Sequence, residues 1–240
     1  MASDETSTPW AQPKFLIAAV LVIALIVLGV VLALSSRNEP DGTSSTPTTP
    51  PGTTTSAPGN AGAESVCGLP GYADSGTLTT APEAEWLFQG TTAYPTSSEY
   101  GPGATSPEGV RYCFQHTPAG ALFAAANAMV QGGDPAVAGE WLDYVVADGP
   151  YREQIASSQE AADSADSRIN IAGFRLLAYN GDSARVDLAV RATSGTSTIL
   201  VSGVYELVWR DGDWKISADV AEPLNVASIP DLAGYVAWGA

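Results

Sequence analysis

The chain has 240 residues, and its 26 acidic residues outnumber its 10 Lys and Arg residues, so the formal net charge is −16 at pH 7. Proteins that bind nucleic acids rely on basic side chains to neutralise phosphates, and this composition argues against DNA or RNA as a partner. The length fits one domain with accessory segments.

An apolar run at residues 15–34 predicts a transmembrane helix. Its twenty residues, FLIAAVLVIALIVLGVVLAL, include no charged or polar side chain. At about 1.5 Å per residue a helix of this length spans about 30 Å, the thickness of the hydrocarbon core. A cleaved signal peptide is the alternative, although its apolar core is usually only ~7–15 residues long. Lys14 and Arg37 flank the run, and one basic residue on each side does not fix its orientation in the membrane. Our expectation that residues 1–14 form a short cytoplasmic tail therefore rests on the remainder of the chain.

Residues 35–64 predict a disordered linker. Of these 30 residues, 12 are Ser or Thr and 9 are Pro or Gly. Such a segment has too little apolar surface to offset the entropy of ordering. We interpret it as a passive spacer; a peptide recognised by a partner is the alternative.

Two cysteines, Cys67 and Cys113, lie in the remaining 65–240 segment. A single pair is too sparse for a zinc site and lacks the CxxC redox spacing, but in an exported domain it favours one disulfide. Two unpaired thiols are the alternative, and would be preferred only in the cytosol. Residues 65–116 otherwise form a loop-rich arm with one predicted strand at residues 85–89, where Trp86 and Phe88 are interpreted as packing residues.

Helix signals begin at Thr117, a predicted N-cap for a helix that starts at Pro118 and ends at two glycines, residues 132–133. Asp134 repeats the start signal for a second helix. The apolar residues of that helix share one face: Val137, Trp141, Leu142 and Val145. A third helix is predicted from residue 151 to about residue 162.

From residue 168 the hydrophobic period changes from 3.6 to 2 and predicts strands at residues 168–179, 184–192, 197–210 and 214–220. On the second strand one face is predicted to be buried, and the other, with Arg185, Asp187 and Arg191, to be solvated. Helices followed by an antiparallel meander predict an α+β fold in which the helices pack on one side of a curved sheet.

Several segments carry a resemblance to known families. The final hairpin, WRDGDWKISA, is similar to the one that closes the cystatin-like, nuclear-transport-factor-two-like cone fold. The segments VCGLPGY, AGALFAAANAMV, IAGFRLLAYNGDSARVDLAVRA and LAGYVAWGA resemble an uncharacterised actinobacterial family of membrane-anchored proteins, similar in turn to the VirB-eight-like subunits of conjugation and type IV secretion machines. The resemblance implies a cone domain at residues 117–240 and brings no catalytic residue.

The residues themselves do not predict an active site. His116 is the only histidine, so capping or surface hydrogen bonding is preferred over catalysis or metal binding. Enzymes with the cone fold use an Asp as general base and a Tyr as hydrogen-bond donor. Asp143, Tyr144 and Tyr205 could take these roles here, although nothing in their spacing requires it. Trp141, Tyr144 and Tyr205 are the candidate cavity residues. We expect no cofactor and no metal.

These patterns predict a single-pass cell-membrane protein whose C-terminal domain lies outside the cytoplasm and acts by binding. The first hypothesis is a non-enzymatic scaffold in the assembly of an envelope conjugation or secretion apparatus. Its partners would be other envelope proteins, and the sequence does not decide whether the protein also forms a homo-oligomer. The alternative is a small-ligand- or lipid-binding accessory of an envelope transport system. Co-purifying machine subunits would favour the first, and lipid in the purified domain the second.

Overall fold

The computed structural model describes residues 64–158, 167–194 and 196–240. The expected cytoplasmic tail, the membrane span at residues 15–34 and all but the last residue of the linker lie outside this part of the chain. Among the residues that the structure describes, no helix is both long and apolar enough to cross a lipid bilayer. The described residues belong to one of two compact units of the chain, Ala57–Ala240.

The arm before the helices contains more strand than its sequence predicts. The predicted strand is present as β1 (Glu85–Gln89), and it pairs with β2 (Thr92–Thr96) in an antiparallel hairpin. A second small pair joins β3 (Ala104–Thr105) to β4 (Arg111–Tyr112). Pro95 lies inside β2, and the other two strands have only two residues each, so none of the three carries a readable alternation.

The first helix, α2 (Pro118–Gly132), begins and ends where its sequence predicts. The side chain of Thr117 accepts a hydrogen bond from the backbone N–H of Gly120 (3.2 Å), which confirms the predicted N-cap. A Cβ atom at Gly120 would lie 1.9 Å from the carbonyl oxygen of Gln115, so the close approach of the preceding loop requires glycine there.

The second helix, α3 (Ala138–Val145), starts later than predicted. Asp134 is not its N-cap, because the Asp134 side chain accepts a hydrogen bond from the N–H of Ala136 (2.8 Å) and closes a separate turn before the helix. The third helix, α4, spans Arg152–Ser158, and its predicted continuation falls on residues outside the described part.

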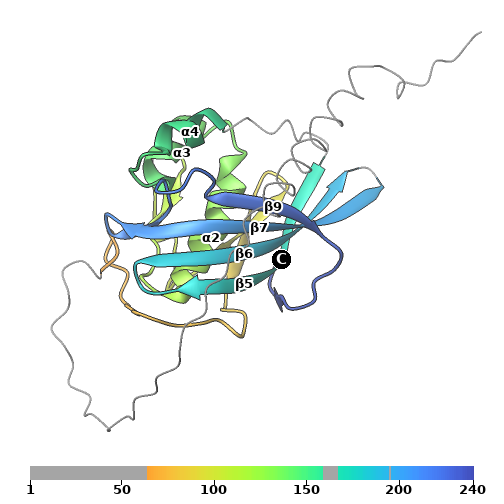
Figure 1. The fold of residues 1–240 in the computed structure, drawn as a ribbon, viewed down its shortest axis with the longest axis horizontal. Coiled ribbons are helices and arrows are strands. Elements are labelled where there is room, and N and C mark those ends of the chain that lie inside the picture. The colour runs from red at the N-terminus through yellow and green to blue at the C-terminus, as the bar shows by residue number, and fades with distance from the viewer. Residues whose placement is uncertain (1–63, 159–166, 195) are drawn as a thin grey trace, which may run out of the picture. The chain divides into compact units, whose positions relative to one another are not determined.

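The main sheet confirms the α+β class with antiparallel strands. Its strand order is β10-β5-β6-β7-β8, and β9 pairs with β7 beside β8. The bounds are β5 (Ser167–Tyr179), β6 (Ser183–Ser194), β7 (Ser197–Arg210), β8 (Asp213–Ile216), β9 (Leu224–Ile229) and β10 (Val236–Ala237). Figure 1 shows α2 crossing one face of β5, β6 and β7, while α3 and α4 lie at one end.

The core lies between α2 and the sheet. Leu122 and Phe123 of α2 and Val186 and Leu188 of β6 are fully buried in one apolar cluster. Ala184, Val186 and Leu188, every second residue of β6, are buried on this face as the sequence predicts, because successive side chains of a strand point to opposite faces.

The opposite face of β6 is not uniformly solvated, and the prediction is wrong at Asp187. This side chain is fully buried. Its carboxylate accepts hydrogen bonds from Arg175 Nε (3.0 Å), Ser202 Oγ (2.6 Å) and Tyr235 Oη (2.9 Å). The ring of Tyr235 also lies 4.2 Å from the guanidinium carbon of Arg175. Donors from β5, β7 and the C-terminal segment therefore satisfy the buried charge, which would otherwise be costly.

Replacing Asp187 should destabilise the fold strongly. In an Asp187→Ala variant the donors of Arg175, Ser202 and Tyr235 lose a shared acceptor, and we expect the free energy of unfolding to fall by about 3 kcal/mol. Urea unfolding followed by tryptophan fluorescence measures the change. The matched control is Asp148→Ala, which removes an exposed carboxylate and should cost less than about 1 kcal/mol. Equal losses in the two variants would contradict the role assigned to Asp187.

Candidate functional site

A cavity of about 520 Å³ lies between the helices and the sheet. We call it the helix–sheet pocket. Six elements contribute to its walls, among others through Met129 of α2, Trp141 of α3, Ile155 of α4, Tyr205 of β7, Ile216 of β8 and Leu224 of β9. A larger depression of about 770 Å³ lies on the arm, but Glu83, Glu85 and Ser97 make it mainly polar, so the helix–sheet pocket is the better candidate for binding an apolar ligand.

Small residues of α2 leave room for the pocket and for Trp141. Ala128 and Gly132 line it, and a Cβ atom on Gly132 would lie 3.4 Å from Cζ2 of Trp141. Trp141 is only 5% exposed, and its indole Nε1 has no hydrogen-bond partner among the residues that the structure describes. Burial raises the pKa of the Tyr205 hydroxyl, which keeps this group protonated near neutral pH.

The structure brings two of the three candidate cavity residues together. Trp141 and Tyr205 both line the helix–sheet pocket. Tyr144 does not: its ring lies 4.7 Å from that of Tyr112, beside a separate cavity of about 10 Å³. The smaller cavity is about the size of one water molecule and offers no room for a substrate.

The three candidate acid–base residues, Asp143, Tyr144 and Tyr205, do not lie at one common site. Asp143 is exposed on α3, where its carboxylate accepts a hydrogen bond from Arg152 Nη2 (2.6 Å). Tyr144 and Tyr205 lie at the two different cavities described above. General acid–base catalysis requires such groups within hydrogen-bond reach of one reacting centre, and this arrangement does not supply it.

His116 is buried, and the expectation of a surface position is wrong. Its ring stacks on Trp209 with the centroids 3.7 Å apart, and its Nε2 donates a hydrogen bond to the carbonyl oxygen of Gly181 (2.7 Å). Tyr72 from the arm contacts the same ring edge-on. In the described residues, no group of three or more His, Cys, Asp or Glu side chains is placed to hold a metal ion. The position of His116 fits a packing role.

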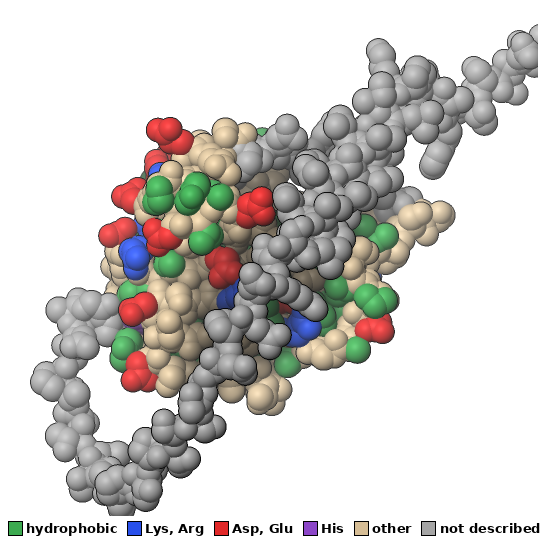
Figure 2. Space-filling model, viewed as in Figure 1, with side chains coloured by type: hydrophobic (Ala, Val, Ile, Leu, Met, Phe, Trp, Pro, Cys, Tyr) green, Lys and Arg blue, Asp and Glu red, His purple; other side chains and the backbone are tan. Residues whose placement is uncertain are grey.

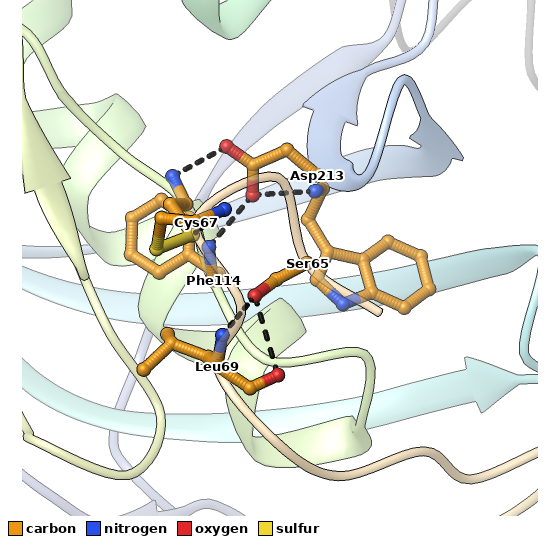
Figure 3. Close-up of a disulfide and its surroundings, with 7 residues drawn as sticks. Ser65, Cys67, Leu69, Phe114 and Asp213 are labelled. Carbon is orange, nitrogen blue, oxygen red and sulfur yellow. Dashed lines mark hydrogen bonds between the residues drawn. A yellow bond between two sulfur atoms is a disulfide. The ribbon is translucent and has the colours of Figure 1, made fainter. Parts of the chain in front are cut away.

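The predicted disulfide between Cys67 and Cys113 is confirmed, and Asp213 supports it. Cys113 has a φ of 68°, in the left-handed region that non-glycine residues rarely adopt. The buried carboxylate of Asp213 accepts the backbone N–H groups of Cys113 (2.6 Å), Phe114 (2.8 Å) and Trp214 (2.8 Å) (Figure 3). The bonds from Cys113 and Phe114 hold the backbone next to the disulfide in its uncommon conformation, and the bond from Trp214 fixes the Asp213 side chain itself.

β9 is an edge strand without the features that usually protect an edge. Among the described residues it pairs only with β7 (Figure 1). Its sequence, LNVASI, has no charged residue and no proline, and Leu224 and Val226 are 41% and 58% exposed. Edge strands are normally blunted by charges, proline, bulges or a covering segment. β9 therefore offers both backbone hydrogen bonds and apolar side chains to another chain.

Sequence reasoning missed β9, and it assigned no role to Asp213, which falls between the predicted strands at residues 197–210 and 214–220. β9 is exposed along most of its length, so it has no buried face and shows no apolar alternation. Asp213 follows Asp211 and Gly212, and both of those residues have positive φ as a tight turn requires. A local pattern cannot reveal that the third residue reaches across to the Cys113 backbone.

The pH dependence of stability should report on Asp213. Burial raises the pKa of its carboxyl from 3.8 to about 6, although three N–H donors favour the ionised form. Because the folded-state pKa is above the unfolded-state value, this contribution to stability is complete below about pH 4 and is lost as the pH rises through about 6.

Relative to an Asp213→Asn variant, which does not titrate, the wild-type protein should lose about 2 kcal/mol of unfolding free energy between pH 4 and pH 7. Urea unfolding of both proteins at the two pH values gives this difference. A difference independent of pH would contradict a raised pKa for the buried carboxyl.

Comparison with known proteins gives a family without an assigned activity. Searches of curated proteins and of solved structures found no match. One family model, described as a domain of unknown function (DUF8175), matches residues 45–237, which is more than half of the chain. The chain therefore belongs to the DUF8175 family.

Proposed function

We propose that this protein is a non-enzymatic, membrane-anchored assembly component that binds other envelope proteins outside the cytoplasm. The observation that carries the proposal is the exposed, uncharged edge of β9. An extended segment of a partner can add to such an edge, with the main chain supplying affinity and alternate side chains supplying specificity. Leu224 and Val226 provide the apolar contacts for that addition.

The disulfide supports the extracytoplasmic location. Disulfides persist in oxidising compartments and are rare in the cytosol. Together with the apolar run at residues 15–34, the Cys67–Cys113 bond favours a single-pass protein with a cytoplasmic N-terminus and an exported C-terminal domain. The Ser/Thr/Pro-rich residues 35–64 would then act as the spacer between membrane and domain.

The arrangement of helices and sheet supports the cystatin-like cone as the finer fold. A long antiparallel meander, β5 to β8, carries α2 across one of its faces, and its last hairpin has the sequence on which the resemblance rests (Figure 1). With the similarity to VirB-eight-like subunits, this favours a conjugation or secretion apparatus as the assembly. The partners are then other envelope subunits or further copies of this chain.

The surface charge favours basic partner surfaces. Glu140, Asp143, Asp148 and Glu153 lie on or between α3 and α4, and Figure 2 shows acidic side chains over that end of the domain. Complementary charge increases association rates and helps exclude wrong partners. The same charge disfavours contact with anionic lipid headgroups or nucleic acids.

A second candidate function is supported by the helix–sheet pocket. An apolar cavity of about 520 Å³ has the size and lining of small-molecule sites in other proteins. An extracytoplasmic accessory that binds a small ligand or lipid for an envelope transport system would use such a cavity. This role and the assembly role involve different surfaces, except at Leu224.

Single-cysteine labelling tests the topology. A Ser98→Cys variant, at an exposed position of the arm, should react with a membrane-impermeant maleimide in intact cells. A Ser7→Cys variant, in the proposed cytoplasmic tail, should react only after permeabilisation. In the parent protein the disulfide-bonded cysteines should remain unlabelled without a reductant. Labelling of Cys67 and Cys113 in intact, unreduced cells would contradict the disulfide, and a Ser98→Cys variant that reacts only after permeabilisation would overturn the extracytoplasmic assignment.

A charge on the β9 edge should disrupt assembly. In a Val226→Lys variant the lysine blunts the edge, and recovery of partner subunits from crosslinked membranes should fall about tenfold, equivalent to about 1.4 kcal/mol of binding free energy. The matched control, Ser98→Lys, adds the same charge to the arm and should leave recovery unchanged. Quantitative mass spectrometry of the purified complexes measures both. The assembly proposal fails if neither a secretion ATPase nor a channel subunit co-purifies with the wild-type protein.

A further inference from the structure

We infer that the helix–sheet pocket binds an uncharged or amine-bearing apolar molecule of about 15–20 non-hydrogen atoms and selects against anions. This inference deepens the second proposed function, the ligand-binding accessory, and rests on it. It does not depend on the assembly role of β9. The argument comes from the volume of the pocket, the chemistry of its walls and the charges around it.

The volume sets the size of the ligand. A water molecule takes up about 30 Å³ in the liquid, and one non-hydrogen atom of an organic molecule with its hydrogens needs a similar space. At about 520 Å³ the pocket therefore accommodates roughly 17 such atoms. This matches two fused or linked aromatic rings or a single medium-length alkyl chain, and it is too small for a two-chain phospholipid.

The walls favour an apolar body with one hydrogen-bond acceptor. Met129, Ile155 and Leu224 supply aliphatic or thioether surface, which gains free energy when a ligand covers it. Trp141 adds an aromatic wall, and in the described part of the chain its indole N–H has no hydrogen-bond partner. Buried donors without a partner are rare in folded proteins. A small shift of the Trp141 ring would let its indole N–H donate a hydrogen bond to an acceptor on the ligand.

The charges around the pocket exclude an anionic ligand. None of the described residues that line the pocket is Lys, Arg or His, and the one charged side chain there is the exposed Glu222 at the rim. An anion entering the pocket would therefore lose its hydration without gaining a cation.

The basic residues on the elements that form the pocket are already paired. Each lies beside a carboxylate: Arg152 with Asp143 (2.6 Å), Lys215 with Asp211 (3.5 Å) and Arg210 with Asp219 (3.8 Å). A neutral ligand avoids the loss of hydration that an anion would suffer in the pocket, and an amine that stays hydrated at the rim would be attracted by Glu222.

Two fluorescent dyes with the same skeleton test the charge selection. N-phenyl-1-naphthylamine is neutral and has the predicted size, and 8-anilinonaphthalene-1-sulfonate is the same molecule with an added sulfonate. We expect the neutral dye to bind the full-length protein, reconstituted in phosphatidylcholine nanodiscs, at least about tenfold more tightly than the sulfonate. Fluorescence titration gives both dissociation constants.

A pocket-filling variant separates pocket binding from partition into lipid. Ala221 lines the pocket, and Gln154 Nε2 donates to its backbone carbonyl oxygen (3.4 Å), an interaction that substitution leaves in place. Ala221→Trp should abolish the saturable dye signal. The control, Val220→Trp, adds the same ring at the neighbouring position, which is 42% exposed and outside the pocket, and should bind as the wild type does.

The outcomes distinguish the inference from the function on which it rests. If both dyes bind equally and Ala221→Trp removes both, the pocket binds ligands and the inferred selection against anions is wrong. If Ala221→Trp has no effect on either dye while its unfolding midpoint matches that of the wild type, the pocket does not bind ligands of this class, and both the inference and the accessory function fail.

Discussion

The buried carboxylate of Asp213 fixes the relation between the arm, the first helix and the sheet. It lies at the start of β8 and accepts backbone N–H groups of Cys113 and Phe114, immediately before α2. Its neighbour Trp214 donates its indole N–H to the carbonyl oxygen of Gln115 (3.0 Å). The sheet therefore holds three consecutive residues of the chain that leads into α2. Since α2 forms one wall of the helix–sheet pocket, these bonds help to set the shape of the pocket.

The disulfide extends this anchor to the arm. Cys113 is held by Asp213, and through Cys67 it closes a loop across a sequence separation of 46 residues. In the loop-entropy model a ring of that size contributes about 4 kcal/mol by restricting the unfolded chain. The arm then contributes its own contacts to the body, such as the edge-on packing of Trp86 against Trp238 at a centroid distance of 5.0 Å. Residues with little regular structure are thereby kept against the core.

The features that could be predicted from the sequence are those encoded by neighbouring residues. The Thr117 cap and the alternation of core-facing residues along β6 each depend on a few consecutive side chains. Asp187 was misread, and the role of Asp213 was missed, because a strand or turn pattern does not report which distant segment covers a carboxylate. Tyr144 was expected at the same cavity as Trp141 and Tyr205, yet its ring packs on Tyr112.

The two edges of the sheet differ, and that difference connects the candidate functions. On one side β10 pairs with β5, whereas β9 has an unpaired outer edge in the described part of the chain. Leu224, the first residue of β9, lines the helix–sheet pocket and pairs with Tyr205, another wall of the same pocket. A ligand in the pocket and a strand added to β9 would therefore contact the same short segment. Two sites are coupled only when each favours one state of a shared element, and the start of β9 is the segment that the two proposed sites would share.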